Sequence, residues 1–203
     1  MTEAEELASG ARVLGVELTD AQRDTLLQFA ALLRRWNAAF NLVSRRDVPR
    51  LIARHLLDAL SLSPMLRGRH VLDLGTGAGL PGLPLAITNP GVEFTLLDRS
   101  ERRIRFVRQA VLELNLKNVA PLTSDYGDFR ANTLFDTVAS RAVAKPVALW
   151  RSAANFLGPG GVALFQVGVL DRDVADFDAN VERMLVRIPG LPEPHHVLRV
   201  SRR

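Results

Sequence analysis

An acidic residue and a run of glycines form the part of the sequence best suited to hold a ligand. The stretch Asp73-Leu-Gly75-Thr-Gly77-Ala-Gly79-Leu-Pro81 follows an apolar segment and precedes one with helical spacing. Glycine permits a sharp turn and lets the backbone approach a ligand closely. Asp98 ends the next apolar segment, where a carboxylate can accept the hydroxyl protons of a ribose. The alternative is a tight strand-to-helix turn, with Asp98 capping a helix that begins near Ser100.

The spacing of the glycines excludes two common nucleotide-binding loops. A dinucleotide loop needs G-x-G-x-x-G, but Leu80 occupies the position of the third glycine. A phosphate loop needs G-x-x-x-x-G-K-[ST], but Leu83 and Pro84 follow Gly82. The pattern D-x-G-x-G-x-G instead resembles motif I of class I S-adenosylmethionine-dependent methyltransferases, in which the glycines admit the amino-acid end of the cofactor. We therefore expect a nucleoside cofactor whose ribose is bound by Asp98.

Short apolar segments and segments of helical period alternate from residue 70 onward. The expected strands are 70–74, 94–97, 119–122, 137–140 and 162–167, with two late strands at 181–188 and 197–200, and the expected helices are 80–87, 104–114 and 147–156. Such alternation predicts a parallel sheet covered by helices, with ligands bound beyond the carboxyl ends of the strands. On the helix after Asp98, the expected core face consists of Ile104, Val107, Val111 and Leu114.

Residues 1–65 are expected to form a helical extension packed on the core, and residues 66–203 a Rossmann-like domain. Thr19 and Gln22 have the spacing of a capping box, and apolar residues then recur along one helix face up to Phe40. A second helix is expected from Pro49 to the stop at 63–64. We expect His55 on that helix to be buried and hydrogen-bonded, and Trp36 and Phe40 to belong to the core.

Composition narrows the class of protein. The 203 residues are 47% hydrophobic and 24% charged, with no cysteine, which excludes disulfides and cysteine nucleophiles. Apart from the adjacent pair His195-His196, the four histidines show no metal-ligand spacing. The apolar runs are too short to span a membrane, and the acidic start is unlike a secretory signal. We expect a cytoplasmic monomer with no metal. The net charge of +4 is carried almost entirely by arginine, which suits phosphate contacts but is also what a GC-rich genome produces.

The chain as a whole resembles the bacterial 16S rRNA guanine-N7 methyltransferases, the glucose-inhibited division protein B family. The resemblance covers nearly the whole chain and is carried by Trp36-Asn37, Asn41–Ser44, Arg54–Asp58, Asp73–Pro84, Leu96–Asp98, Arg105–Val107, Ser140–Ala142 and His196-Val197. It implies a class I Rossmann-like fold with a mostly parallel seven-stranded sheet, and S-adenosyl-L-methionine as cofactor. The implied substrate is a guanine of the 530 loop (position 527) in 16S rRNA, within the 30S subunit or an assembly intermediate.

The resemblance also implies roles for particular residues. Gly75 and Leu80 line the cofactor pocket, Asp98 takes the ribose, and Arg141 closes the pocket after the fourth strand. Relatives usually carry an acid at the position of Gly127, so Asp125, Asp128 or the backbone at Tyr126–Gly127 is expected to hold the adenine. The expected cofactor-binding set is Asp73, Gly75, Gly77, Gly79, Leu80, Asp98, Tyr126, Gly127 and Arg141.

RNA contacts are expected from arginines at the rim of the loops. Where relatives often have a lysine, before the glycine aligned with Gly168, this chain has Val167, so Lys145 or an arginine would contact RNA instead. The expected RNA-binding set is Arg45, Arg46, Arg102, Arg103 and Lys145, and the alternative is that these arginines only solvate helix faces.

Residue types exclude several methyl-transfer chemistries. Pyrimidine C5 methylation needs a cysteine, and adenine amino methylation usually needs an Asn/Asp-Pro-Pro-aromatic motif where this chain reads Ser140-Arg141-Ala142-Val143. Guanine N7 has a free lone pair and needs no general base, so the catalytic residue stays unassigned, with Asp125, Asp128 and Arg141 as candidates. The competing hypotheses are a methyltransferase acting on a small molecule and a nucleoside-binding adaptor without turnover.

Overall fold

The computed structural model describes residues 1–141, 145–167 and 177–203. The helical segments are α1 (Glu3–Val13), α2 (Asp20–Phe40), η1 (Val48–Arg50), η2 (Ile52–Leu57), α3 (Asp58–Leu60), η3 (Ser63–Met65), α4 (Gly82–Thr88), α5 (Glu101–Glu113), α6 (Pro146–Ala153) and η4 (Ala154–Phe156). The strands are β1 (His70–Leu74), β2 (Glu93–Asp98), β3 (Val119–Thr123), β4 (Phe135–Arg141), β5 (Leu157–Val167), β6 (Asn180–Val186) and β7 (His195–Ser201).

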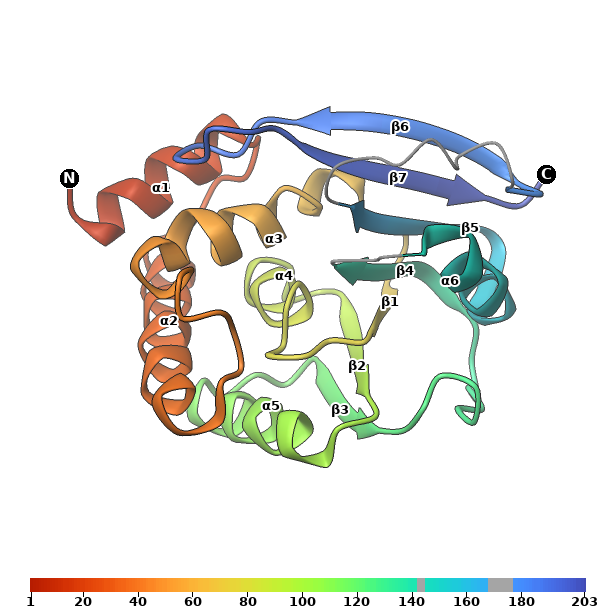
Figure 1. Ribbon diagram of the computed structural model, residues 1–203, viewed down its shortest axis with the longest axis horizontal. Coiled ribbons are helices and arrows are strands. Elements are labelled where there is room, and N and C mark those ends of the chain that lie inside the picture. Colours follow the sequence, from red (N-terminus) through yellow and green to blue (C-terminus); the bar gives the residue numbers. More distant parts are fainter. Residues whose placement is uncertain (142–144, 168–176) are drawn as a thin grey trace.

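The strands form one seven-stranded sheet in the order β3-β2-β1-β4-β5-β7-β6. The pairs from β3 to β5 are parallel, whereas β7 runs antiparallel to both β5 and β6. Helices α4 and α5 cover one side of the sheet and α6 lies on the other (Figure 1). The predicted mostly parallel α/β sheet of seven strands is confirmed, and every expected strand is present with its ends moved by a few residues.

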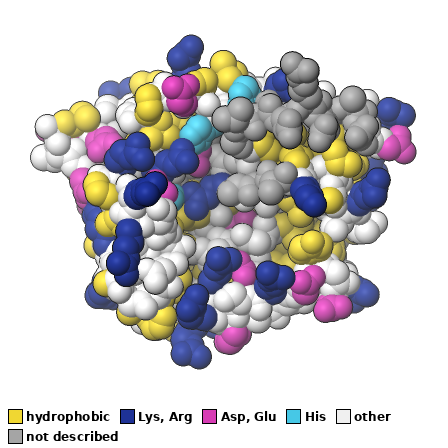
Figure 2. All heavy atoms as spheres, viewed as in Figure 1, with side chains coloured by type: hydrophobic (Ala, Val, Ile, Leu, Met, Phe, Trp, Pro, Cys, Tyr) yellow, Lys and Arg dark blue, Asp and Glu magenta, His cyan; other side chains and the backbone are white. Residues whose placement is uncertain are grey.

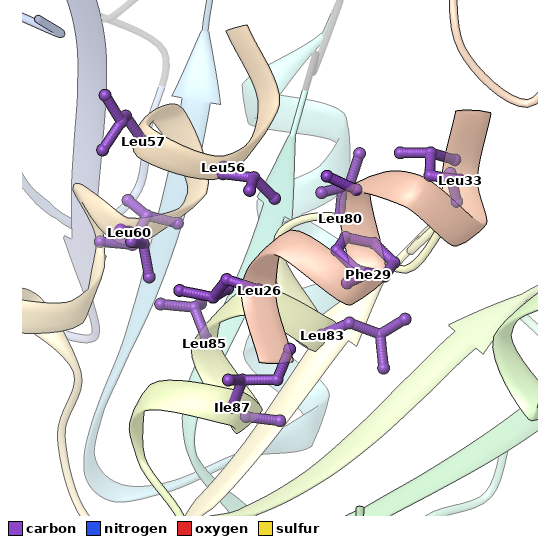
Figure 3. Packing of buried hydrophobic residues seen from close by; sticks show 14 of the residues in the cluster. Leu26, Phe29, Leu33, Leu56, Leu57, Leu60, Leu80, Leu83, Leu85 and Ile87 are labelled. Carbon is purple, nitrogen blue, oxygen red and sulfur yellow. The ribbon is translucent and has the colours of Figure 1, made fainter. Parts of the chain in front are cut away.

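The N-terminal helices share a hydrophobic core with the sheet. Thr19 and Gln22 form the predicted capping box, since the Gln22 amide donates to Thr19 Oγ1 and the Thr19 amide to Gln22 Oε1. Leu26, Phe29 and Leu33 of α2 are fully buried. Figure 3 shows them packing with leucines of η2 and α3 and with α4. Burial of this continuous apolar surface positions η2 beside the sheet.

Two details of the helices differ from expectation. The second helix is not a regular α-helix: residues 52–57 form a π-helical segment that contains His55 and leads into α3. On α5, Ile104 and Val107 are buried as predicted, but Phe106 and Ala110 are buried as well, while Val111 and Leu114 are only partly buried. All four predicted residues contact the core, and the buried face is wider than predicted because α5 packs against α2 as well as the sheet.

Aromatic contacts show how α2 and α5 meet. The rings of Trp36 and Phe106 have centroids 5.6 Å apart, and Phe40 lies 5.1 Å from Trp36. Trp36 packs against the main core, as predicted, while Phe40 is half-buried at its edge. Within the described residues, no helix is long and apolar enough to cross a membrane, and no group of three His, Asp or Glu side chains is arranged to hold a metal ion.

Candidate functional site: two pockets at the carboxyl edge of the sheet

The glycine loop turns sharply where β1 ends. Gly75, Gly77 and Gly79 have φ angles of 72°, 58° and 76°, in the left-handed region that favours glycine. The amides of Gly75 and Thr76 both donate to the carbonyl of Leu97, at 2.8 and 2.9 Å. These hydrogen bonds attach the loop to the end of β2, so the loop is held rigidly against the neighbouring strand.

Asp73 organises this loop from inside the protein. Its side chain is fully buried, and Oδ2 accepts hydrogen bonds from Thr76 Oγ1 at 2.6 Å and from the Gly82 amide at 2.8 Å. A Cβ at Gly82 would lie only 2.7 Å from Oδ2, so α4 can begin there only with glycine. Burial raises the pKa of the Asp73 carboxyl to about 6, although both hydrogen bonds act in the opposite direction. Asp73 therefore shapes the site from beneath the loop.

Asp98 connects the loop to the start of α5. Oδ2 accepts from the Gly77 amide and Oδ1 from the Ser100 amide, both at 2.9 Å, and Arg103 Nη1 lies 3.4 Å from Oδ2. The side chain is buried. The ribose and capping interpretations of Asp98 are thus compatible, because each carboxylate oxygen can accept more than one hydrogen bond.

A cavity of about 580 Å³ opens beside these groups. It is lined by residues at the carboxyl ends of three adjacent strands and in the turns that follow: Leu74, Gly75, Leu97, Asp98, Arg99, Arg103, Ser124, Asp125 and Tyr126. This volume is typical of sites for nucleotide-sized ligands, and the position is where open α/β sheets bind them.

The turn after β3 divides its residues between this cavity and an adjacent groove. Asp125 and the half-exposed Tyr126 line the cavity, and Asp125 Oδ1 accepts from the Gly127 amide at 2.9 Å. Gly127, together with Tyr126, lines the neighbouring groove of about 470 Å³. Asp128 is exposed. Of Asp125 and Asp128, the two candidates in this turn, only Asp125 lines the cavity.

Leu80 and Arg141, which the family resemblance places at the cofactor pocket, are not among the residues that line the larger cavity. Leu80 is buried in the same core cluster as Phe29 (Figure 3), because the loop turns inward before α4, so its side chain belongs to the core and not to the cavity. Arg141, at the end of β4, lines a second, smaller pocket of about 230 Å³. That pocket lies over β4 and β5, beside the larger cavity over β1 to β3.

The smaller pocket contains a connected set of polar side chains. Arg141 Nη1 donates to His55 Nδ1 at 2.8 Å and lies 3.9 Å from Asp58 Oδ2. Burial, helped by the charges of Arg141 and Arg54, lowers the pKa of His55 to about 3, so this imidazole is neutral. Burial also lowers the pKa of Arg141. His55 is buried and hydrogen-bonded, as predicted.

Asp58 connects these side chains to residues of β5 and β7. Its Oδ1 accepts from His195 Nδ1 at 2.7 Å, and Gln166 Nε2 donates to the Asp58 carbonyl oxygen at 2.8 Å. Arg54 Nη1 donates to His195 Nε2 at 2.9 Å. Sequence reasoning assigned no role to Arg54, Asp58 or Gln166. The available signal was a group of polar residues in a leucine-rich helical segment, but their partners come from β5 and β7.

The expected RNA-binding residues occupy different environments. Arg45, Arg46, Arg102 and Lys145 are exposed, and basic side chains are numerous on the face seen in Figure 2. Arg103 is exposed as well, and its guanidinium also lies at the cavity beside Asp98. Ala142 and Val143 of the Ser140–Val143 stretch, and Gly168 after Val167, lie outside the described residues.

Comparison with known proteins identifies the family. Residues 22–184 match the family described as rRNA small subunit methyltransferase G. The chain is 41% identical over 194 residues to the ribosomal RNA small subunit methyltransferase G of Methylococcus capsulatus, which covers 94% of this chain and 95% of that relative. The chain belongs to this family. The rRNA small subunit methyltransferase G of Chromohalobacter salexigens is similar to it as well, at 40% identity over 203 residues, covering 97% of this chain and 96% of the relative.

The fold of this member of the rRNA small subunit methyltransferase G family is also that of more distant methyltransferases. The glycopeptide N-methyltransferase MtfA matches 79% of this chain and all of its own, with a TM-score of 0.61 at 14% identity. TYW2 from M. jannaschii, solved in complex with AdoMet, matches 73% of this chain and 76% of its own, with a TM-score of 0.59 at 16% identity. At such identities the likeness establishes the class I methyltransferase fold alone.

Proposed function

We propose that this chain transfers the methyl group of S-adenosyl-L-methionine to N7 of a guanine in the 530 loop of 16S rRNA. Membership of the rRNA small subunit methyltransferase G family supports the reaction and the class of substrate. The observation that carries the proposal is the cavity in which Gly75 and the buried Asp98 meet at the ends of β1 and β2. We further propose that the enzyme acts as a monomer in the cytoplasm, on the small subunit or an assembly intermediate.

The residues present fit the cofactor. A Cβ on Gly75 would meet no atom within 4 Å, so the missing side chain leaves the cavity open where the loop passes. Asp98 would accept the ribose hydroxyls, and Asp125 with the backbone at Tyr126–Gly127 would bind the adenine side. Asp73, Gly77 and Gly79 would act by holding the loop in shape. When bound, the cofactor supplies an electrophilic methyl group on a sulfonium.

Methyl transfer to guanine N7 does not need a general acid or a general base. Guanine N7 carries a free lone pair, so the protein has to position the base and stabilise the positive charge that develops on it. Arg141 would oppose that charge if it stood alone, but Asp58 Oδ2 lies 3.9 Å from its guanidinium and balances it. Of the two candidate carboxylates in the turn after β3, Asp125 lies at the cavity and Asp128 outside it.

The decisive experiment is methyl transfer to small subunits that lack the modification. We expect label from S-adenosylmethionine to enter 16S rRNA at one guanine, and borohydride/aniline cleavage to map 7-methylguanine in the 530 loop. Absence of cleavage after complete incubation would reject the proposal. Methylation of a metabolite without RNA would indicate a small-molecule methyltransferase, and cofactor binding without any transfer would indicate an adaptor.

A further inference from the structure

The smaller pocket, over the ends of β4 and β5, is not used by the cofactor in the proposed function. Its volume of about 230 Å³ is below the ~300–1,000 Å³ typical of larger ligands and suits a single planar base. Strand β4 lies next to β1 in the sheet, so this pocket adjoins the glycine-loop cavity. A group bound here would be close to a cofactor bound there.

Gln166 presents an unsatisfied acceptor in this pocket. Its side chain is 4% exposed, and Nε2 donates to the carbonyl oxygen of Asp58 at 2.8 Å and to Asp58 Oδ1 at 3.2 Å. These two bonds fix the orientation of the amide, because only the NH₂ group can donate to them. Oε1 is therefore the remaining atom, and it has no hydrogen-bond partner among the described residues. Leaving such a buried oxygen unpaired is costly, which favours a ligand donor there.

His55 presents an unsatisfied donor in the same pocket. Its Nδ1 accepts from Arg141 Nη1, so the neutral ring carries its proton on Nε2. That Nε2–H is buried and finds no acceptor in the part of the chain that the structure describes. Two residues that line the pocket thus carry one buried acceptor and one buried donor that have no partners in the described segments, and Asp58 lines the pocket with them.

The surrounding hydrogen bonds hold these groups in place. Asp58 Oδ1 accepts from His195 Nδ1, and Arg54 in turn donates to His195 Nε2. Since Arg54 donates to Nε2, His195 is the Nδ1–H tautomer and its proton points to Asp58. A pocket fixed in this way can discriminate between ligands by hydrogen bonding, because a ligand with the wrong donor pattern leaves buried groups unpaired.

We propose that this pocket receives the target guanine, with Gln166 Oε1 accepting from the 2-amino group and His55 Nε2–H donating to O6. This inference rests on the proposed function and deepens it by naming the residues that select the base. Guanine carries an acceptor at O6 and donors at N1 and N2, whereas adenine reverses the pattern with a donor at N6 and an acceptor at N1. A phosphate group would not fit, because it has no donor for Gln166 Oε1 or Asp58.

The test combines a substrate change with a protein change. Unmodified small subunits are reconstituted with 16S rRNA that carries either guanosine or inosine at the target, since inosine keeps N7, O6 and N1–H but lacks the 2-amino group. We expect wild-type kcat/KM to favour guanosine on the order of 10-fold or more. In Gln166→Met this preference should fall to roughly 3-fold or less, with unchanged affinity for S-adenosylmethionine in calorimetry.

Two further variants distinguish a loss of selectivity for guanine from a loss of protein stability. Gln166→Glu removes the NH₂ group that bonds Asp58 and places a second carboxylate beside it, so the acceptor is no longer held in place and the preference for guanosine should fall as in Gln166→Met. Thr137→Val removes a buried hydroxyl that bonds the backbone of Arg67, just before β1, so it should lower stability without altering the guanosine-to-inosine ratio. An unchanged ratio in Gln166→Met, or equal wild-type rates on guanosine and inosine, would overturn the inference.

A crosslinking experiment distinguishes failure of this inference from failure of the proposed function. The same rRNA is prepared with 6-thioguanosine at the target, irradiated with the protein and S-adenosylhomocysteine, and the crosslinked peptide is identified by mass spectrometry. We expect a peptide from residues 52–58 or the end of β5. A crosslink at 126–134 instead would place the base in the neighbouring groove and refute the inference, even if N7 methylation occurs. If neither guanosine nor inosine is methylated, the proposed function fails. The crosslinked peptide still shows which of the two sites the target base contacts.

Discussion

At the scale of single residues, the two buried aspartates of the cofactor cavity perform different tasks. Asp98 lines the cavity and holds Gly77 and Ser100 with its two oxygens. Asp73 is fully buried beneath the loop and holds Thr76 and Gly82. Substitution of Asp98 should therefore affect the ligand first, whereas substitution of Asp73 should affect the loop and its stability.

We expect Asp98→Asn to weaken binding of S-adenosylmethionine by on the order of 1–3 kcal/mol. The substitution replaces one of the two buried carboxylate oxygens that would accept from the ribose hydroxyls with an NH₂ group, which cannot accept. Calorimetry measures the effect. Asp128→Asn is the matched control, since Asp128 has the same side chain in an exposed position of the turn after β3. Equal affinities for the two variants would contradict the role of Asp98.

The pKa of Asp73 predicts how stability changes with pH. The folded carboxyl keeps its proton up to about pH 6, whereas the ordinary value is 3.8, so between these pH values the folded state binds more protons. This carboxyl therefore destabilises the fold as pH rises from 3.8 to 6, by up to roughly 3 kcal/mol. His55, whose pKa is lowered from 6.5 to about 3, acts in the opposite direction over the whole of this range, because the unfolded state binds more protons there.

Comparison with Asp73→Asn isolates the contribution of this carboxyl, since the effect of His55 is common to both proteins. Asn can still accept from Thr76 and Gly82 but carries no charge. We expect the stability of Asp73→Asn relative to wild type to be higher at pH 7 than at pH 4, as measured by urea unfolding. A difference between the two proteins that does not change with pH would show that Asp73 is ionised normally in the fold.

At the scale of elements, the glycine loop matters because it combines backbone conformation with open space. Gly79 and Gly82 face tight packing, since a Cβ there would lie 2.3 Å from Leu83 and 2.7 Å from Asp73 Oδ2. Gly75 is different, because a Cβ there would meet no atom within 4 Å. Its side of the loop borders the cavity, so its requirement for glycine comes from φ and from the ligand.

Gly15 provides a matched control for Gly75. It has a φ of 75°, close to the 72° of Gly75, and its Cβ would also meet nothing within 4 Å. We expect Gly75→Ala and Gly15→Ala to lower stability equally, by about 1 kcal/mol, because alanine is strained at positive φ. Only Gly75→Ala should weaken S-adenosylmethionine binding, on the order of 10-fold, because its methyl group enters the cavity. Equal affinities in calorimetry would show that the cofactor does not approach Gly75.

At the scale of the whole molecule, arginines give this chain its positive charge. The net charge is +4, and Lys117 and Lys145 are the only lysines in the sequence. Arg45, Arg46, Arg102 and Arg103 are all exposed, but Arg103 is also paired with Asp98 at the cavity, which leaves the other three without a part in the cofactor site. These three remain the candidates for binding rRNA phosphates, while their alternative role is solvation of the surface.

We expect a variant with Arg45, Arg46 and Arg102 all changed to Gln to bind small-subunit RNA more weakly. The slope of log affinity against log salt should decrease in magnitude by about 1 for each phosphate that the variant no longer binds. Affinity for S-adenosylmethionine should be unchanged. Arg12→Gln on α1 is the control, since Arg12 is exposed on the N-terminal helix. If the slope of the triple variant stays at the wild-type value, the RNA lies on another face.

The sequence alone determined the order of strands and helices and the position of the glycine-loop site. Strands β1 to β5 and the capping box at Thr19 were predicted because alternation of apolar segments and capping patterns are local properties of the chain. Asp98 was predicted at the end of β2 for the same reason. A parallel sheet brings the ends of adjacent strands together, so a short motif sufficed to locate the cavity.

Only the tertiary structure decided the second pocket and the position of Leu80. Asp58 and Gln166 are 108 residues apart, and His195 reaches Asp58 from β7. Their contacts depend on how the N-terminal helices pack across the sheet, and no local pattern records that packing. The inward course of the chain before α4 likewise places Leu80 in the core, because burial depends on the neighbours that folding brings close and not on the spacing of residues alone.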